Sequence, residues 1–147
     1  MPKYLCALLA LLTLTVAAGC GGDDGRSKED YVKDLNKICK ETGAEIRAVK
    51  SPRTIKQIGL VARKARPILQ DRIERTDKLE LPDEGSAQLQ DYNNDFEKSL
   101  STVDLIERAA ATGKRRPVQV AFAKTIQENK KLDAKAKKLG LTDCVTG

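Results

Sequence analysis

Cysteine is the residue type in this chain that points most directly to covalent chemistry. The 147 residues include four cysteines, Cys6, Cys20, Cys39 and Cys144, and no histidine. Without histidine, the usual serine–histidine and cysteine–histidine pairs of nucleophilic catalysis cannot form, and the commonest metal ligand is missing. No two cysteines have the C-x-x-C spacing of a redox or metal site. We therefore expect no enzyme activity, no catalytic residue, no metal site and no cofactor.

The first nineteen residues have the layout of an export signal. Lys3 is followed by a largely apolar, uncharged run of 14 residues, from Leu5 to Ala18. As a helix this run would be about 21 Å long, which is shorter than the ~30 Å hydrocarbon core that a membrane-spanning helix must cross. A basic start, a short apolar middle and small residues before a cleavage site are typical of a secretory signal.

Cys20 directly follows these small residues. The segment Ala17-Ala18-Gly19-Cys20 resembles the lipobox of bacterial lipoproteins, with Ala17 where leucine is usual. The resemblance implies that residues 1–19 are a lipoprotein signal peptide and that Cys20 is lipidated, for example by palmitate. The chain would then be anchored to the extracytoplasmic side of the cell membrane. Two alternatives remain: ordinary cleavage after Ala18 or Gly19, which releases a free Cys20, and an uncleaved anchor.

Cys39 and Cys144 are the two cysteines that such processing leaves free. In an exported chain, two remaining thiols are usually oxidised to each other. We therefore expect a disulfide that joins the first helical segment to the C-terminal tail and closes a loop of about 105 residues. The chain-entropy model gives such a loop about 4 to 5 kcal/mol of stabilisation.

Residues 20–27 are expected to form a flexible tether. Gly21-Gly22-Asp23-Asp24-Gly25-Arg26 contains three glycines and no apolar residue. Seven such residues span at most roughly 25 Å, so the domain that follows would lie close to the membrane surface.

Residues 28–147 are expected to form one helical domain. Ser27 followed by Asp30 resembles a capping box, and Gly140 before an apolar residue is typical of a helix-ending turn. Apolar residues recur every three or four positions in four segments, at about residues 28–49, 52–79, 83–112 and 117–139. The fold class is therefore all-α, an antiparallel four-helix bundle closed by one disulfide.

Prolines set the details of the second segment. Ser51-Pro52 pairs a capping residue with a proline at the first helical position, so the segment is expected to begin there. Pro67 lies in its interior, where proline removes a backbone hydrogen bond and is expected to kink or split the helix.

Charge differs between the segments. Residues 52–79 contain eight basic and three acidic side chains, a net charge of +5; residues 80–112 contain two and eight, a net charge of −6; residues 113–139 contain nine and two, a net charge of +7. An acidic helix between two basic ones suits up-down order, in which sequence neighbours are spatial neighbours. Much of this charge should therefore be balanced between helices, with each exposed pair contributing under ~1 kcal/mol.

The basic residues of the fourth segment define a candidate contact surface. Lys124, Lys131, Lys135 and Lys138 are spaced to fall near one side of a helix, with Lys114-Arg115-Arg116 just before them. Anionic headgroups attract such clusters, so an anionic lipid or envelope polymer is a possible partner. The alternative is a solvated face that keeps the domain soluble. Nucleic acid is not expected, because there are few aromatic residues for base stacking.

Acidic residues near the middle of the chain imitate the start of a calcium-binding loop. Asp91-Tyr92-Asn93-Asn94-Asp95 matches D-x-N-x-D. However, Phe96 replaces the glycine that the loop requires, and Thr102 replaces its bidentate glutamate. These residues are therefore interpreted as a helical surface.

Three short motifs carry a resemblance over most of the exported chain. They are Tyr31 with Asn36-Lys37-Ile38-Cys39, then Leu79-Glu80-Leu81-Pro82, and finally Gly140-Leu141-Thr142-Asp143-Cys144. With these motifs the chain resembles small actinobacterial envelope lipoproteins of unassigned function. The resemblance implies an exported, lipidated helical domain with its two cysteines paired, and it implies no activity.

The functional expectation is a lipid-anchored envelope lipoprotein that acts as a non-catalytic binding or structural module and meets a protein partner of unknown identity. The alternative is a small-ligand carrier with an apolar cavity between its helices. These two functions differ in one structural property, because the carrier needs unfilled volume inside the bundle.

Overall fold

The protein is an all-α bundle, as shown by a computed structural model that describes residues 25–146. The expected signal peptide 1–19, Cys20 and tether residues 21–24 lie outside the described residues. Within 25–146 there is no strand, and no helix combines the length and the apolarity needed to cross a membrane. The elements are α1 (Lys28–Ala48), α2 (Ile55–Asp77), α3 (Ser86–Ala111), α4 (Arg115–Leu139) and the 3-10 helix η1 (Thr142–Cys144). The predicted four-helix bundle is confirmed.

Two helix ends form as the sequence predicts. Ser27 caps α1, because its Oγ accepts a hydrogen bond from the backbone N–H of Asp30 at 3.1 Å. Gly140 ends α4 in the left-handed conformation, with φ of +77°. The N–H of Leu141 then donates to the carbonyl of Ala136 at 2.9 Å, which turns the chain back and buries the Leu141 side chain completely.

The start of α2 differs from the prediction. Ser51-Pro52 lie in a loop, and the helix begins directly after Thr54. The Thr54 hydroxyl accepts the N–H of Gln57 at 3.2 Å, while the Gln57 side-chain oxygen accepts the N–H of Arg53 at 2.7 Å. When the helix begins after Thr54, side chains therefore accept hydrogen bonds from two backbone N–H groups. This capping outweighs the preference of Pro52 for the first turn of a helix.

Pro67 lies inside α2 without splitting it, contrary to one of the two outcomes expected for this residue. Its side chain is exposed. Proline leaves the carbonyl four residues earlier, that of Arg63, without its amide partner. Because Arg63 is also exposed, this carbonyl lies on the solvent side, where water is available to replace the missing donor.

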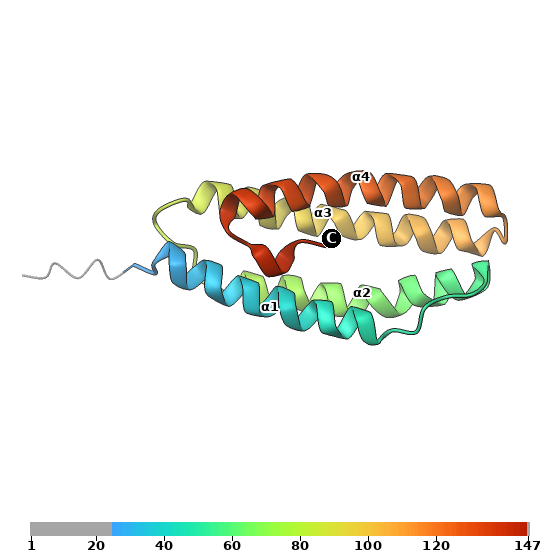
Figure 1. Ribbon diagram of the computed structural model, residues 1–147, viewed down its shortest axis with the longest axis horizontal. Helices are drawn as coiled ribbons and strands as arrows, with labels where there is room; N and C mark the ends of the chain where they lie inside the picture. The colour runs from blue at the N-terminus through green and yellow to red at the C-terminus, as the bar shows by residue number, and fades with distance from the viewer. Residues whose placement is uncertain (1–24, 147) are drawn as a thin grey trace, which may run out of the picture.

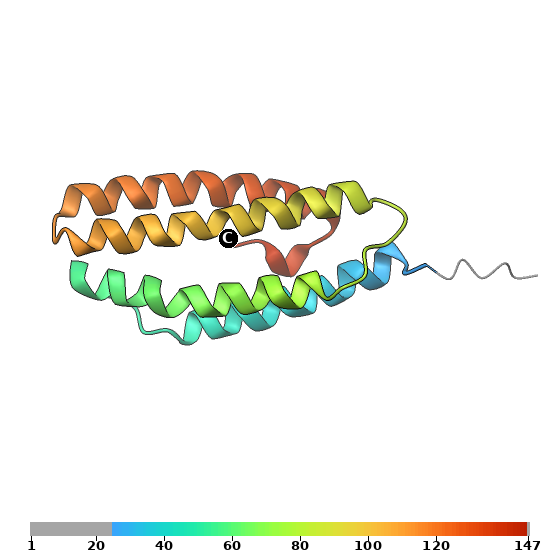
Figure 2. The same cartoon turned by 180° about the vertical axis from the view of Figure 1, so that it is seen from behind.

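The helices form two antiparallel pairs, α1 with α2 and α3 with α4 (Figures 1 and 2). Helix α2 packs on α3, so the two pairs are joined along one side. On the other side, the C-terminal segment with η1 turns back from the end of α4 and lies between α4 and α1 (Figure 1). The tail therefore occupies the position where the outer helices of a closed bundle would meet.

Helix α1 does not reach as far along the bundle as its neighbours. It ends at Ala48, and the loop 49–54 continues toward the start of α2 at the far end of the molecule (Figures 1 and 2). At that end, remote from residue 25, the bundle consists of α2, α3 and α4 alone. Part of the inner surface of these three helices is thus left without a fourth helix over it.

The core consists of two separate apolar clusters. The first, around Tyr31, Leu35 and Tyr92, lies at the end of the bundle that contains the C-terminal tail. The second, around Ala109, Val118 and Ala121, joins α3 to α4 at the opposite end. Four further buried side chains are polar or charged. They are Thr42, Arg72, Thr76 and Thr102.

The predicted disulfide between Cys39 and Cys144 is present and fixes the tail to α1. The two Cα atoms are 4.9 Å apart, and 105 positions separate the residues in sequence. Asn36 adds two hydrogen bonds: its Nδ2 donates to the carbonyl of Gly140 at 3.1 Å, and its Oδ1 accepts the N–H of Asp143 at 3.0 Å. The tail is therefore an integral part of the bundle.

Ion pairs connect the acidic helix α3 to the basic helices on either side. Toward α2, Arg63 Nε donates to Glu107 Oε1 at 2.9 Å, and a second pair joins Arg66 to Asp104. Toward α4, Lys135 Nζ pairs with Asp91 at 2.6 Å and with Asp95. The Lys135 ammonium lowers the pKa of Asp95, chiefly through this hydrogen bond. The predicted balance of charge between helices is confirmed for these pairs.

Candidate functional site: an interhelical groove

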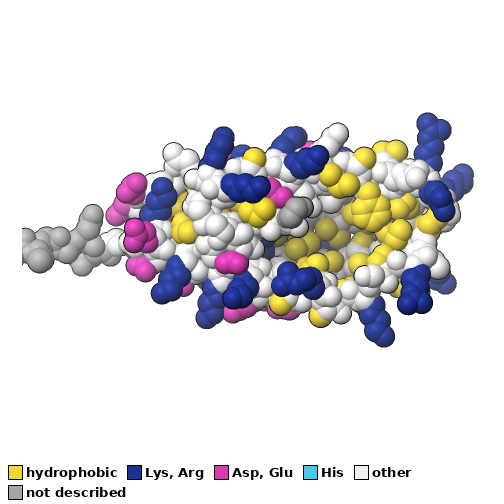
Figure 3. Space-filling view, viewed as in Figure 1, with side chains coloured by type: hydrophobic (Ala, Val, Ile, Leu, Met, Phe, Trp, Pro, Cys, Tyr) yellow, Lys and Arg dark blue, Asp and Glu magenta, His cyan; other side chains and the backbone are white. Residues whose placement is uncertain are grey.

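A groove of about 630 Å³ runs between α1 and α4. Residues of all four helices line it, and the C-terminal segment Thr142–Thr146 contributes to one end. We call it the interhelical groove. Figure 3 shows a hollow with apolar side chains inside it on this face, between the two helix pairs and beyond the tail. Its volume lies within the ~300–1,000 Å³ range of small-molecule sites.

The groove exists because small side chains occupy inward positions at mid-bundle. Gly43 on α1, Ala65 on α2, and Ser99 and Thr102 on α3 all line it. A leucine or phenylalanine at these positions would fill the space, as Leu35 and Tyr92 do in the neighbouring cluster. The tail also separates α1 from α4, which prevents the walls from closing.

Apolar side chains provide most of the contact surface. Ile46, Leu69, Val103 and Leu132, one from each helix, line the groove and are each partly exposed. Beyond the lining residues of α4, the apolar surface extends through Phe122 and Ile126, with exposures of 39% and 54%. These residues lie three positions before the lining residues Thr125 and Asn129, which places them on the same side of α4.

Arg72 is the charged residue in the floor of the groove. Only 7% of its surface is exposed. One guanidinium nitrogen, Nη2, donates to the Tyr92 hydroxyl at 2.8 Å. The guanidinium carbon lies 3.4 Å from the centroid of the Phe96 ring, so the cation is stacked on an aromatic face. Burial lowers the pKa of Arg72, although the Tyr92 contact opposes this effect.

The positive charge of Arg72 is not matched by a carboxylate. Among residues 25–146, no aspartate or glutamate forms a salt bridge with it. Its Nε atom is buried and has no hydrogen-bond partner within the same range. Arg75, one turn later, provides the contrast, because it pairs with Glu41 on α1 and thereby lowers the pKa of that carboxyl. Buried charges in proteins are normally paired, so Arg72 is an exception to be explained.

The other charged groups of the groove lie nearer its rim. Lys40 and Arg47 are exposed residues of α1, and Asp143 is an exposed residue of η1. At the tail end, Asp133 accepts hydrogen bonds from the N–H of Thr146 at 2.9 Å and from its hydroxyl. The Asp133 carboxylate therefore already accepts hydrogen bonds from the tail. Arg72 is the buried charged residue of the groove.

The lysines singled out on α4 are only partly available as a contact surface. Lys135 is paired with Asp91 and Asp95, and Lys131 lies 3.3 Å from Glu128 on its own helix. Lys124 and Lys138 are exposed. Lys114-Arg115-Arg116 lie at the end of the bundle remote from residue 25 (Figure 1). The basic residues are therefore spread over the length of the molecule rather than gathered at one end.

The residues that imitate a calcium loop are part of helix α3. Asp91 and Asp95 face Lys135, and Asn94 accepts a hydrogen bond from Gln90 one turn before it. These interactions support the interpretation of the motif as a helical surface.

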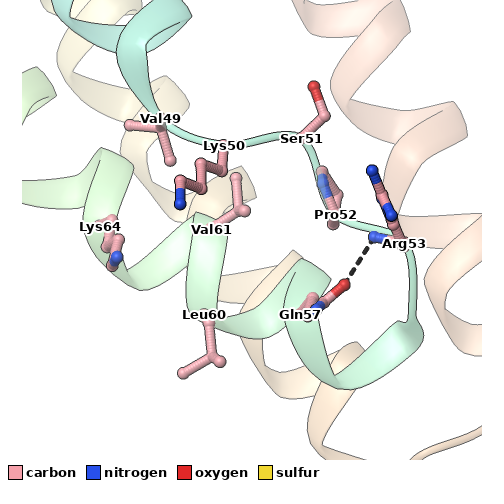
Figure 4. Close-up of a pocket in the computed structure, with 9 residues that line it drawn as sticks. All are labelled: Val49, Lys50, Ser51, Pro52, Arg53, Gln57, Leu60, Val61 and Lys64. Carbon is pink, nitrogen blue, oxygen red and sulfur yellow. Dashed lines mark hydrogen bonds between the residues drawn. The ribbon is translucent and has the colours of Figure 1, made fainter.

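A second hollow, of about 560 Å³, lies against the loop between α1 and α2. Figure 4 shows its lining residues, including the hydrogen bond from the backbone N–H of Arg53 to the side-chain oxygen of Gln57 and the Leu60 side chain directed away from the loop. Lys50, Arg53 and Lys64 make it basic, but most of its lining residues are exposed. It would bury little of a ligand, whereas the interhelical groove includes the buried residue Arg72.

Arg72 was not identified from the sequence, although a signal for it exists. Inward positions along α2 recur at Ala62, Ala65, Leu69, Arg72 and Thr76, with spacings of three and four residues. A charged residue within such an otherwise uncharged series indicates a buried charge.

No protein-family model, curated protein or solved structure matches this chain. The functional proposal is therefore based on the fold and on the chemistry of the groove.

Proposed function

We propose that this chain is a lipid-anchored, non-catalytic binding module on the extracytoplasmic side of the cell membrane. The anchor would be Cys20, and the module would resemble small actinobacterial envelope lipoproteins. Of the binding and structural roles, the interhelical groove favours binding, and specifically the role of a small-ligand carrier. The observation that supports this choice is the unfilled volume of about 630 Å³ lined by side chains of all four helices.

Three properties of the groove suit a carrier. Its walls are largely apolar, so a ligand would be held mainly by the removal of its apolar surface from water. Its polar groups are few, which is how small-molecule sites provide orientation. Its tail end is fixed by the disulfide and by Asn36, so the site is formed in advance and a ligand need not pay for ordering it.

Filling the groove is expected to abolish ligand binding without unfolding the protein. Ala65 is a partly exposed lining residue, and the Ala65→Phe side chain would occupy the space of a ligand. Native mass spectrometry of the full-length chain released from membranes should show bound small molecules for the wild type. For Ala65→Phe, the bound fraction should fall at least about tenfold.

The matched control is Ala134→Phe, which adds the same side chain at an exposed position of α4 that does not line the groove. This variant should retain the wild-type bound fraction. A wild-type chain without any bound molecule, or equal binding by both variants, would contradict the carrier function.

The anchor is tested separately by acyl labelling in the producing cell. Wild-type chain should incorporate a clickable palmitate analogue, and Cys20→Ala should not, because the thiol is the attachment point. Absence of label from the wild type would remove the anchor while leaving the groove proposal unaffected.

A further inference from the structure

We infer that the ligand of the interhelical groove is a long-chain carboxylate, whose head group pairs with Arg72 and whose apolar chain lies along the groove. This inference rests on the proposed binding function and adds the chemical class of the ligand. It is carried by the buried guanidinium of Arg72, which lines the groove and has no carboxylate partner within residues 25–146.

The charge of Arg72 selects an anion. A buried unpaired charge is costly, and the surrounding side chains reduce this cost only in part, through one neutral hydroxyl and the aromatic rings of Phe96 and Tyr92. A neutral ligand in the groove would displace water from near the guanidinium and increase the cost. An anionic group placed there would instead form charge-assisted hydrogen bonds, which are stronger than hydrogen bonds between neutral groups.

The number of charges favours a monoanion. Arg72 is one positive charge, and the neighbouring buried residues Thr76 and Thr102 are neutral. One carboxylate would therefore leave the floor of the groove electrically neutral. A dianionic phosphate would leave an excess negative charge in the same low-dielectric surroundings. The planar guanidinium also matches the geometry of a carboxylate.

The apolar residues that line the groove beside Arg72 favour a ligand whose carboxylate carries a long hydrocarbon chain. Leu69 and Val103 line the groove, and Phe122 and Ile126 continue the exposed apolar surface along α4. The tail occupies the opposite end. An extended hydrocarbon chain starting at Arg72 would therefore run toward the open, three-helix end of the bundle and cover apolar surface that now meets water.

The test compares two photoreactive probes that differ only in their head groups: a diazirine-bearing palmitic acid and the corresponding alcohol. Full-length chain in phosphatidylcholine vesicles is irradiated with each probe, and labelled peptides are identified by mass spectrometry. In the wild type, the acid should label groove peptides at least about tenfold more than the alcohol, because only the acid forms an ion pair with Arg72.

Variants of Arg72 test whether this residue causes the preference for the acid over the alcohol. Arg72→Met should reduce labelling by the acid to the level of the alcohol, whereas Arg72→Lys should retain much of it. Arg63→Gln is the matched control, since Arg63 lies on the same helix but is exposed and pairs with Glu107. This control should behave like the wild type.

Each outcome has a distinct meaning. Equal labelling of groove peptides by acid and alcohol overturns the inference and leaves the proposed binding function standing. A preference for the acid that persists in Arg72→Met overturns the assignment to Arg72. Labelling of the groove by neither probe overturns the inference, and the proposed binding function is then decided by the native mass spectrometry of the wild type and Ala65→Phe. The comparison of acid and alcohol on the wild type remains decisive if Arg72→Met does not fold.

Discussion

Removing the Cys39–Cys144 disulfide is expected to lower the free energy of unfolding by about 4 to 5 kcal/mol. The bond joins residues 105 positions apart, so its loss greatly enlarges the ensemble of unfolded conformations. Cys39→Ala/Cys144→Ala is the suitable variant, because both side chains are buried and alanine leaves no unsatisfied polar group. The measurement is urea denaturation of the full-length chain followed by circular dichroism.

Reduction of the wild type provides an independent control for this variant. Dithiothreitol should reproduce the stability loss of the double variant and should have no effect on the double variant itself. Amide exchange should also increase in residues 140–146, because the disulfide and Asn36 together hold this segment against α1. A loss of stability below about 1 kcal/mol would show that the tail is held without the covalent bond.

Leu35→Ala is expected to destabilise the protein by about 2 to 5 kcal/mol. The Leu35 side chain is completely buried in the cluster that joins α1 to α3, α4 and the tail. Shortening it to alanine removes apolar contacts and leaves a cavity, and both effects favour the unfolded state. Urea denaturation of the full-length chain under oxidising conditions measures the loss while the disulfide remains intact.

Leu60→Ala is the matched control, because this leucine is 45% exposed on α2. Its replacement should change the free energy of unfolding by less than about 0.5 kcal/mol. Similar losses for the two variants would mean that the first cluster is not the main core of the domain.

The helices could be predicted from sequence because their signals are local. The inward series of α3, with Leu89, Tyr92 and Phe96, has helical spacing, and Ser27 and Gly140 mark helix ends by their own backbone chemistry. The disulfide was predicted from the number of cysteines together with the expected export of the chain. The ion pairs of α3 followed from the alternation of charge between consecutive helices.

From the sequence, a cavity between the helices was only an alternative, because such a space depends on distances between helices. Apolar periodicity identifies the inward face of a helix, but not how closely the facing helix approaches it. Ala65 and Thr102 are small enough to allow the helices to pack closely around them. The groove is nevertheless open, because the tail separates α1 from α4. The sequence also did not predict that α2 begins only at Ile55. The loop before it replaces a fourth helix at one end of the bundle, because α1 already ends at Ala48.

If the protein is the proposed carrier, the end of α1 at Ala48 also limits the size of its ligand. Each further helical turn on α1 would extend its wall by about 5.4 Å over the open end of the bundle. Each turn removed would expose a similar length of α2, α3 and α4. In the proposed carrier, the position at which α1 gives way to the loop 49–54 would therefore limit the length of the bound hydrocarbon chain.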